Sequence, residues 1–360
     1  MENNSPKIIQ WILDTRPLWP VPAKEKKQDE VAELKTVASR ALALLSDSEQ
    51  ASVLKYYHVR DAKMSLASHL LKHLVISKYC NVPWSKAMVS RTSNGKPCYV
   101  PPAKIPSMGS HVMFDFNVSH QAGIVSLIAA VGFKNQVDTG TDVVCVNERE
   151  SRDSEYIQKS GFFDWVDIHG EVFSESEISF MKLGPILPSD LGIEGEFMGY
   201  GKDRISRCQR RGGEVAVNVK RGDHEEEVNV KTSKVIDVKM RRFYAMWCLR
   251  ESFVKMTGEA LLAPWLKELE ILDVQAPTVK EGHLTKESLE QGGVQHEFRI
   301  IFKGKPVTDV RMELSALGEA FMVGGALRAR DPDERNAAVM GSWQELDLEE
   351  DILKPAESNP

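Results

Sequence analysis

The stretch Arg241–Gly258 (RRFYAMWCLRESFVKMTG) constrains the fold most strongly, because it predicts a long amphipathic helix. It contains no proline and ends at a glycine. It places Trp247, Glu251 and Lys255 four residues apart, so that an aromatic ring, a carboxylate and an ammonium group share one helix face. An apolar stripe that can pack this helix against a core is formed by Phe243, Met246, Phe253 and Val254.

Taken alone, this row of three residues, Trp247, Glu251 and Lys255, is typical of a helix with an exposed salt bridge between Glu251 and Lys255. Such pairs at i, i+4 are common on helices and say little about function. The row gains a chemical interpretation only from motifs elsewhere in the chain.

Composition limits the class of protein. A chain of 360 residues can bury a large core and form one large or two medium domains. Its net charge of -6 argues against a general nucleic-acid binder. The longest apolar runs are shorter than eighteen residues, and the N-terminus MENNSPKIIQ lacks the pattern of a signal peptide. We therefore expect a cytoplasmic protein that does not span a membrane.

The cysteines and histidines argue against a zinc site. The cysteines are odd in number, widely scattered and without a CxxC pair: Cys80, Cys98, Cys145, Cys208 and Cys248. The nine histidines show no HExxH or similar spacing. We expect reduced thiols, as in a cytosolic protein.

The first half of the chain predicts strands around two helices. The predicted elements are a strand at 8–13, helices at 30–45 and 55–79, two strands within 114–130 joined by a turn at 119–123, and a strand at 136–146.

The second half repeats a helix followed by strands. A capped helix is predicted to start within 173–182. Residues 183–238 read as a long insertion, partly a polar hairpin and partly mobile. Strands are predicted at 265–273, 296–303 and 320–328, with a turn at Gly292-Gly293. The acidic tail from Asp331 ends in Pro355–Pro360, which we expect to be disordered. The repeated order suggests two similar α+β halves.

Four short motifs occur in a fixed order along the chain. They are Gly95-Lys96-Pro97, Phe116-Asn117-Val118-Ser119-His120, Gly140-Thr141-Asp142, and Trp247-(x)3-Glu251-(x)3-Lys255. Each is weak alone, but as an ordered set they resemble the 4'-phosphopantetheinyl transferases of the larger, surfactin-synthetase-activating type. The broad-range filamentous-fungal members are the most similar. Tyr57–Lys63 and Phe173–Glu177 match as well, and the resemblance covers most of residues 45–330 outside the insertion.

The resemblance implies an α+β fold of two pseudo-symmetric halves, with the active site in the cleft between them. On this basis we expect one half at 1–138, a second at 139–330 that includes the insertion at about 183–238, and an acidic tail at 331–360. A monomer is also implied, because both halves of the site belong to one chain.

The resemblance further implies a Mg²⁺-dependent enzyme. It would transfer the 4'-phosphopantetheine arm of coenzyme A to a serine of an acyl or peptidyl carrier domain and release adenosine 3',5'-bisphosphate. The expected partners are carriers of fatty-acid, polyketide and nonribosomal peptide synthases, and aminoadipate reductase in lysine synthesis. Two alternatives stay open: a metal-dependent hydrolase of coenzyme A or nucleotide pyrophosphates, and a non-catalytic module that binds coenzyme A or a carrier.

Site residues follow from matching the motifs position by position. Asp142 and Glu251 would hold Mg²⁺, an ion that prefers carboxylate, phosphate and water oxygens. Lys255, one turn after Glu251, would reach a phosphate oxygen as a point charge. The remaining contacts to coenzyme A would come from Arg91, Gly95, Lys96, Pro97, Ser119, His120 and Lys55.

Some of these residues also have a purely structural interpretation. His120 could be a histidine of a capped turn, and Trp247 is better explained as a packing anchor than as a ligand contact. The basic run Lys202–Arg211 could dock an acidic carrier, although a mobile solvated loop explains it better. The proton of the attacking serine could go to Glu251 or to a metal-bound water or hydroxide.

Three departures from the family pattern affect the site. Many bacterial relatives place a second acidic residue where this chain has Val144, and Gln121 is a candidate replacement ligand. The family lysine before the glutamate is Arg250 here, which keeps the charge but not the geometry. Bacterial lysines that contact the 3'-phosphate correspond to Glu49 and Ser52.

Overall fold

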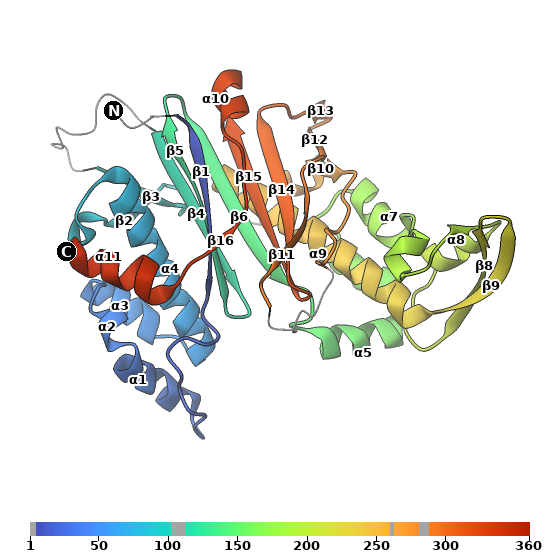
Figure 1. Ribbon diagram of the computed structural model, residues 1–360, viewed down its shortest axis with the longest axis horizontal. Coiled ribbons are helices and arrows are strands. Elements are labelled where there is room, and N and C mark those ends of the chain that lie inside the picture. The colour runs from blue at the N-terminus through green and yellow to red at the C-terminus, as the bar shows by residue number, and fades with distance from the viewer. Residues whose placement is uncertain (1–4, 102–112, 260–262, 281–287) are drawn as a thin grey trace.

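Two β-sheets pack face to face in the middle of the protein, and a long helix covers the outer face of each (Figure 1). The computed structural model describes residues 5–101, 113–259, 263–280 and 288–360. It confirms the predicted mixed α+β class. The first sheet has the order β16-β1-β5-β4 and the second the order β11-β14-β15-β6.

The strands of both sheets run antiparallel, except that β16 pairs in parallel with β1. In the first sheet the strands are β1 (Lys7–Asp14), β4 (Met113–Gln121), β5 (Ile124–Phe133) and β16 (Gln344–Glu345). In the second they are β6 (Val137–Cys145), β11 (Gln291–Gln295), β14 (Val310–Leu317) and β15 (Phe321–Ala329).

Side chains of each strand point alternately to the two faces of its sheet, and this creates three apolar layers. One lies under each long helix and one lies between the sheets. In β5, Val125 and Leu127 face the first long helix, whereas Ile124 and Ile128 face the second sheet. In β6, Val143 faces the first sheet. Because both faces of these strands are buried, each sheet is covered on two sides, and the core continues from one long helix to the other.

The two long helices are α4 (Val59–Cys80) and α9 (Thr232–Thr257). The apolar side chains of α4 pack on β4 and β5, and those of α9 pack on β6, β14 and β15. Helix α9 ends at Gly258, which adopts a left-handed conformation with φ of 76°. It starts nine residues before the helix that the sequence predicts, so the insertion ends earlier than expected.

The two sheets repeat one connection pattern. In the first, β1 pairs with β5, and β5 pairs with β4 after the chain has passed through α4. In the second, β6 pairs with β15, and β15 pairs with β14 after the chain has passed through α9. A strand, a helix and a hairpin therefore occur in the same order and with the same neighbours twice.

A row of polar side chains joins the two sheets where β4 lies beside β6. The two strands share no backbone pairing in the described chain. Instead, alternate side chains of β4 bond to β6. Asn117 Oδ1 accepts from Thr141 N at 3.4 Å, and Gln121 Oε1 accepts from Cys145 N at 3.0 Å. The sheets thus meet along side-chain hydrogen bonds.

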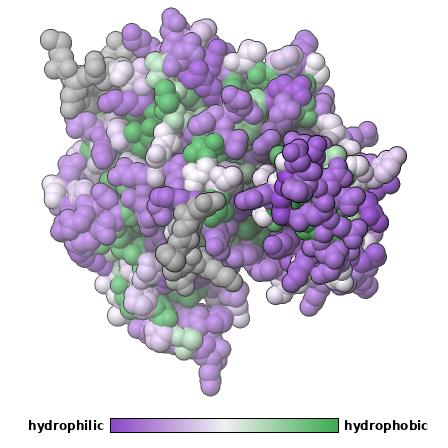
Figure 2. Space-filling view, turned by 45° about the vertical axis from the view of Figure 1, so that its right-hand side comes forward, coloured by the Kyte–Doolittle hydropathy of each residue, from purple (hydrophilic) through white to green (hydrophobic). Residues whose placement is uncertain are grey.

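The insertion is a folded unit with its own core, where the sequence predicts a partly mobile segment. It contains η2 (Pro188–Leu191), β7 (Glu196–Phe197), α8 (Gly201–Ser206), β8 (Glu214–Arg221) and β9 (His224–Lys231). Its interior is an apolar cluster that includes Phe197, Ile205 and Val219, and its outer surface is mainly hydrophilic (Figure 2). The predicted polar hairpin corresponds to β8 and β9, whereas the expectation of a mobile part was wrong because these buried side chains are spread thinly along a polar sequence.

A buried lysine holds the base of the insertion. Lys239 on α9 is fully buried, and its ammonium group donates to the carbonyl oxygens of Lys182, Ser206 and Cys208. It also lies 5.1 Å from the ring centre of Phe163. Burial lowers the pKa of Lys239 to about 8. These contacts fix the insertion to the helix that follows it.

Shorter elements surround this framework. The helices are α1 (Lys27–Val37), α2 (Ser39–Leu42), α3 (Asp47–Leu54), η1 (Trp84–Lys86), α5 (Glu150–Ser160), α6 (Phe162–Asp167), α7 (Glu175–Leu183), η3 (Leu266–Glu268), α10 (Pro332–Ala337), η4 (Leu348–Leu353) and α11 (Lys354–Ser358). The strands are β2 (Val89–Arg91), β3 (Pro97–Tyr99), β10 (Leu269–Leu272), β12 (Arg299–Phe302) and β13 (Lys305–Pro306).

Several predicted boundaries were wrong. The helix expected at 30–45 is divided into α1 and α2, and the one expected at 55–79 begins only at Val59. The predicted turn at 119–123 shrinks to Ala122-Gly123, so its first residues belong to β4. Gly292 and Gly293 lie in strand β11 rather than in a turn, because glycines here let the backbone of Thr278 approach closely.

The C-terminal tail is ordered, contrary to expectation. Its strand β16 extends the first sheet, and α11 occupies most of the segment predicted to be disordered. Trp84 N donates to Asn359 O at 2.8 Å, and Leu353 is buried in the first core. Within the part of the chain that the structure describes, no helix is long and apolar enough to cross a membrane.

Candidate active site

The Gly-Thr-Asp motif lies where β6 passes under α9. A Cβ atom on Gly140 would lie 2.1 Å from Ser252 O and 2.4 Å from Met256 N. A glycine is therefore required for the helix to approach the strand so closely. This contact brings Asp142, the last residue of the motif, beneath the last turns of α9.

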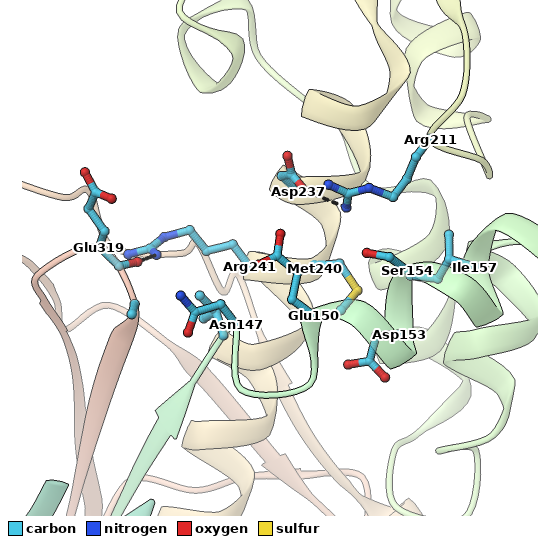
Figure 3. Close-up of a pocket in the computed structure, with 12 residues that line it drawn as sticks. Asn147, Glu150, Asp153, Ser154, Ile157, Arg211, Asp237, Met240, Arg241 and Glu319 are labelled. Carbon is cyan, nitrogen blue, oxygen red and sulfur yellow. Dashed lines mark hydrogen bonds and ion pairs between the residues drawn. The ribbon is translucent and has the colours of Figure 1, made fainter. Parts of the chain in front are cut away.

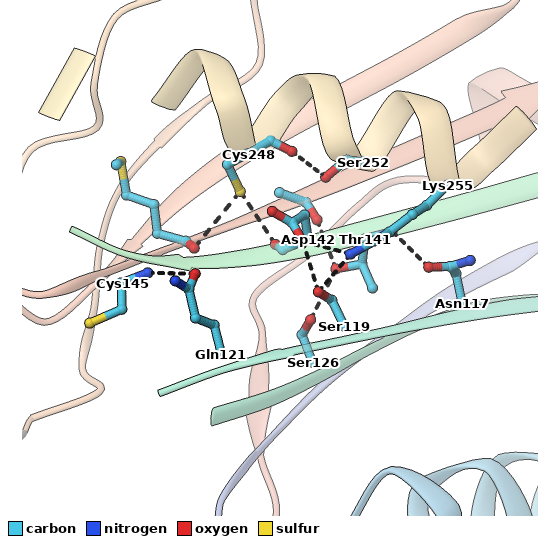
Figure 4. A network of polar contacts seen from close by, with 12 residues as sticks. Asn117, Ser119, Gln121, Ser126, Thr141, Asp142, Cys145, Cys248, Ser252 and Lys255 are labelled. Carbon is cyan, nitrogen blue, oxygen red and sulfur yellow. Dashed lines mark hydrogen bonds and ion pairs between the residues drawn. The ribbon is translucent and has the colours of Figure 1, made fainter. Parts of the chain in front are cut away.

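Lys255, Asp142 and Ser119 form a closed triangle of polar contacts (Figure 4). Lys255 Nζ lies 2.6 Å from Asp142 Oδ1 and donates to Ser119 Oγ at 2.8 Å. Ser119 Oγ in turn donates to Asp142 Oδ1 at 2.8 Å. The three side chains come from α9, β6 and β4, so this contact joins the two sheets and the helix.

Glu251 lies beside this triangle without a partner of its own. Among the described residues it has no hydrogen bond or ion pair. Burial raises its pKa to about 7, and the negative charge of Asp142 adds to the shift, while Lys255 opposes it. The exposed salt bridge between Glu251 and Lys255 is therefore absent, because Lys255 turns to Asp142. The site holds two carboxylates and one ammonium group.

The residues next to this row hold it in place. Trp247 packs against Phe243, with ring centres 5.9 Å apart, which confirms the predicted packing role. Arg250 is buried and donates to Glu177, to Leu266 O at 2.7 Å and to Leu269 O at 2.8 Å. The arginine at this position therefore fastens α9 to α7 and β10 and faces away from the triangle.

The position of the missing acidic residue is apolar in the structure. Val144 is buried in the core beneath α9. The Gln121 amide donates to Glu148 Oε2 at 2.7 Å and accepts from the backbone N–H of Cys145. Both of its polar atoms are thus engaged in joining β4 to the end of β6.

His120 belongs to strand β4 and not to a capped turn. The residue is exposed, although nearby protein atoms partly desolvate its side chain. This partial desolvation lowers its pKa, and the positive charges of Lys255 and Lys72 lower it further. Lys72, which the sequence analysis does not single out, is buried on α4, and burial together with nearby Arg91 lowers its pKa to about 8. His120 thus lies in a positively charged region.

The Gly-Lys-Pro loop joins β2 to β3 on the first half. Arg91 Nη1 donates to Gly95 O at 2.7 Å, and Gly95 has φ of 84°, which favours glycine. The side chain of Lys96 leaves this exposed loop and pairs with Asp115 Oδ2 at 2.7 Å. Burial raises the pKa of Asp115 despite the ammonium group beside it.

Lys55 stands apart from the other predicted contacts. It is exposed at the end of α3, where it lines a cavity of about 260 Å³ whose other lining residues include Val31 and Tyr57. None of the other predicted site residues lines this cavity. The side chain of Glu49 caps α3, and its Oε1 lies 2.9 Å from His73 Nε2. Glu49 therefore has a structural role.

A separate cavity of about 300 Å³ lies between α5, α9 and the end of β6 (Figure 3). None of the predicted site residues lines it. Both of its arginines already have partners: Arg211 pairs with Asp237 at 2.6 Å, and Arg241 Nη1 donates to Glu319 O at 3.0 Å. We therefore place the candidate site at the triangle and not at this cavity.

The arrangement suits a doubly negative ligand. Lys255, Lys72 and Arg91 supply positive charge, and the two carboxylates near Lys255 can share a cation. Among the described residues, no group of three or more His, Cys, Asp or Glu side chains is placed to hold a metal ion. A cation here would take two protein carboxylates and complete its coordination with ligand or water oxygens.

Comparisons with known proteins agree with the motifs. A family model described as the N-terminal part of 4'-phosphopantetheinyl transferase matches residues 34–132. The chain is 38% identical to 4'-phosphopantetheinyl transferase 1 of Fusarium mangiferae, over 96% of this chain and 94% of the relative. It is 38% identical to a 4'-phosphopantetheinyl transferase of Aureobasidium melanogenum, over 98% of each. An L-aminoadipate-semialdehyde dehydrogenase-phosphopantetheinyl transferase of Schizosaccharomyces pombe is 33% identical over 34% of this chain and 41% of the relative.

Proposed function

This chain belongs to the 4'-phosphopantetheinyl transferases, and we propose that Asp142, Glu251 and Lys255 form the centre at which it modifies a carrier domain. The enzyme moves the 4'-phosphopantetheine arm of coenzyme A to a serine of the carrier. The serine oxygen bonds to the phosphorus that bears the arm, the pyrophosphate P–O bond breaks, and adenosine 3',5'-bisphosphate leaves. The observation that carries the assignment is the contact between Lys255 and Asp142 beside unpartnered Glu251.

The donor set fits a Mg²⁺ ion. Asp142 and Glu251 are close enough that the charge of one raises the pKa of the other, a repulsion that a divalent cation would remove. When bound, Mg²⁺ would neutralise charge on the pyrophosphate. Lys255 would bind a phosphate oxygen with the one N–H group that it does not give to Asp142 and Ser119. Positioning and charge stabilisation then supply most of the catalysis.

Two pseudo-symmetric halves, 1–138 and 139–330, form the cleft in this proposal. The repeated connection of β1-α4-β4-β5 and β6-α9-β14-β15 supports it. The adenosine end of coenzyme A would meet the first half through Arg91, Gly95, Lys96, Pro97 and His120. The pyrophosphate would lie at Ser119 and the carboxylates. Lys55 is left out of this site because it lines a different cavity.

The carrier is the second substrate. Aminoadipate reductase is one proposed carrier, and a relative from Schizosaccharomyces pombe, whose name includes L-aminoadipate-semialdehyde dehydrogenase, supports a carrier in this class of enzyme. Carrier domains are acidic, so docking calls for a positive or apolar surface. We assign no docking role to the run Lys202–Arg211, since α8 and the insertion core use part of it for their own packing.

The test is the intact mass of a purified apo carrier after incubation with coenzyme A, Mg²⁺ and the protein. Asp142→Asn and Glu251→Gln run alongside, with Asp237→Asn as a control carboxylate on the same helix. We expect one phosphopantetheine mass with the wild type and the control, and at least a hundredfold slower gain with the two site variants. Full activity in both site variants would contradict the assignment. Coenzyme A cleaved without a gain in carrier mass would favour the hydrolase.

A further inference from the structure

Lys96 has an unusual environment for a lysine in an exposed hairpin loop. Its backbone neighbours in the loop are exposed, yet its own side chain is only 8% exposed. The stem passes over the end of α9, where a Cβ atom on Gly258 would lie 3.7 Å from Lys96 Cδ. Its ammonium group then meets Asp115 Oδ2 at 2.7 Å. The loop of one half therefore contacts the catalytic helix of the other.

Asp115 is itself fixed by the second half of the protein. The same oxygen, Oδ2, accepts from Thr139 N at 2.6 Å and from Thr139 Oγ1 at 2.8 Å. Thr139 lies on β6, three residues before Asp142, which is about 10 Å along a strand. One carboxylate oxygen thus links the Gly-Lys-Pro loop to the strand that carries the proposed metal ligand.

This geometry limits the motion of Lys96. A free lysine side chain has many rotamers, and ordering it when a ligand binds costs free energy. Lys96 is already ordered, and its ammonium group keeps N–H donors that Asp115 does not use. A phosphate group could therefore bind without first immobilising the side chain.

We propose that Asp115 is a positioning residue that holds Lys96 in place for a phosphate group of coenzyme A and aligns it with the strand that carries Asp142. This rests on the proposed function, in which Lys96 contacts coenzyme A. Asp115 would not touch the substrate. It would act through Lys96, and it would align the loop and the pyrophosphate site because both are tied to β6.

A double-mutant cycle tests this. The affinity for coenzyme A is measured by calorimetry, and kcat and KM are measured with an apo carrier. The proteins are the wild type, Asp115→Asn, Lys96→Ala and the double variant. We expect Asp115→Asn to weaken the binding of coenzyme A and to raise the KM for coenzyme A three- to tenfold. The kcat should stay within twofold of the wild-type value. The double variant should bind like Lys96→Ala alone, because Asp115 matters only when Lys96 is present.

The outcomes separate this inference from the function itself. An equal effect of Asp115→Asn with and without Lys96 would show a purely structural role and overturn it. Unchanged affinity in Asp115→Asn would do the same while carrier modification continued. Unchanged affinity in Lys96→Ala would remove both the loop assignment and this inference. If Asp115→Asn folds poorly, Thr139→Val removes one of the hydrogen bonds to the carboxylate and should give a smaller effect in the same direction.

Discussion

Lys255 Nζ lies 2.6 Å from Asp142 Oδ1, although Glu251 is one helical turn away on the same face of α9. A surface salt bridge would have joined the two helix residues. The chain instead directs the ammonium group across to β6 and leaves Glu251 without a partner among the described residues. Helix α9, strand β6 and the interface between the sheets therefore meet at the ammonium group of Lys255.

Lys255→Met should abolish most of the activity while the fold survives. The side chain is partly exposed, so the change removes a charge without opening a large cavity. We expect kcat/KM for carrier modification to fall at least a hundredfold, because a positive charge at the proposed phosphate site is lost. The rate is followed by carrier mass, with circular dichroism as the folding check. A fall of less than fivefold would contradict the proposed role.

Glu251 should make stability depend on pH. Its pKa is about 7 in the folded chain and near 4.5 when unfolded, so the folded state binds the extra proton between these values. The free energy of unfolding should therefore fall as pH rises from about 4.5 to about 7. In Glu251→Gln, the decrease in the free energy of unfolding between pH 5 and pH 8 should be smaller than in the wild type by about 2 kcal/mol. Urea unfolding at pH 5 and pH 8, with a chelator present, measures the difference.

Mg²⁺ supplies the control for that experiment. Bound between Glu251 and Asp142, it would favour the ionised carboxylate and remove the penalty at pH 8. Stabilisation of the wild type by Mg²⁺ should exceed that of Glu251→Gln. Equal stabilisation of both proteins would argue against the metal site.

Arg250→Lys should destabilise the protein by about 2–4 kcal/mol, although the charge is kept. A lysine cannot reach Glu177 and two carbonyl oxygens at once as the guanidinium group does. Thermal or urea unfolding checks this, with Arg152→Lys on the exposed face of α5 as the matched control. A midpoint equal to that of the control would show that the geometry is unimportant.

Gly140→Ala should prevent close packing of α9 on β6. The added methyl group would overlap the backbone at Ser252 and Met256, which cannot move aside as a side chain could. We expect a loss of about 3 kcal/mol or more. Gly341→Ala serves as the comparison, because a Cβ atom there would meet nothing within 4 Å and, as at Gly140, the backbone has no positive φ. Near-equal unfolding midpoints for the two variants would refute this explanation of the motif.

The sequence predicted the class of fold and much of helix α9 because their signals are local. Helix periodicity identified much of α9, and the alternation in 114–130 identified β4 and β5. The start of α9 was missed because Thr232–Met240 is polar on its surface and is held by a buried lysine whose carbonyl partners are distant in sequence. The insertion core was missed for the same reason.

The sequence proposes members for the candidate site but does not predict their contacts. Motif matching named Asp142, Glu251, Lys255 and Ser119, yet pairing between residues 113 positions apart depends on how α9 packs on β6. Asp115 and Lys72 were missed altogether. A signal for Asp115 was present, since polar residues alternate at 115, 117, 119 and 121, where a strand normally needs only one polar face toward water.

Strand β9 runs directly into α9, and this limits where the chain can gain or lose residues. The hairpin turns at Gly222, where an added Cβ atom would meet nothing within 4 Å, whereas Lys239 ties the base of the insertion to three carbonyl groups. Residues gained or lost at the turn would leave the helix undisturbed, but deletion of the whole unit would expose a buried charge ahead of the catalytic row. The turn of the hairpin should therefore tolerate length changes during evolution and the insertion of a peptide tag. The base of the insertion should not, because it is fixed to the helix that carries the proposed site residues.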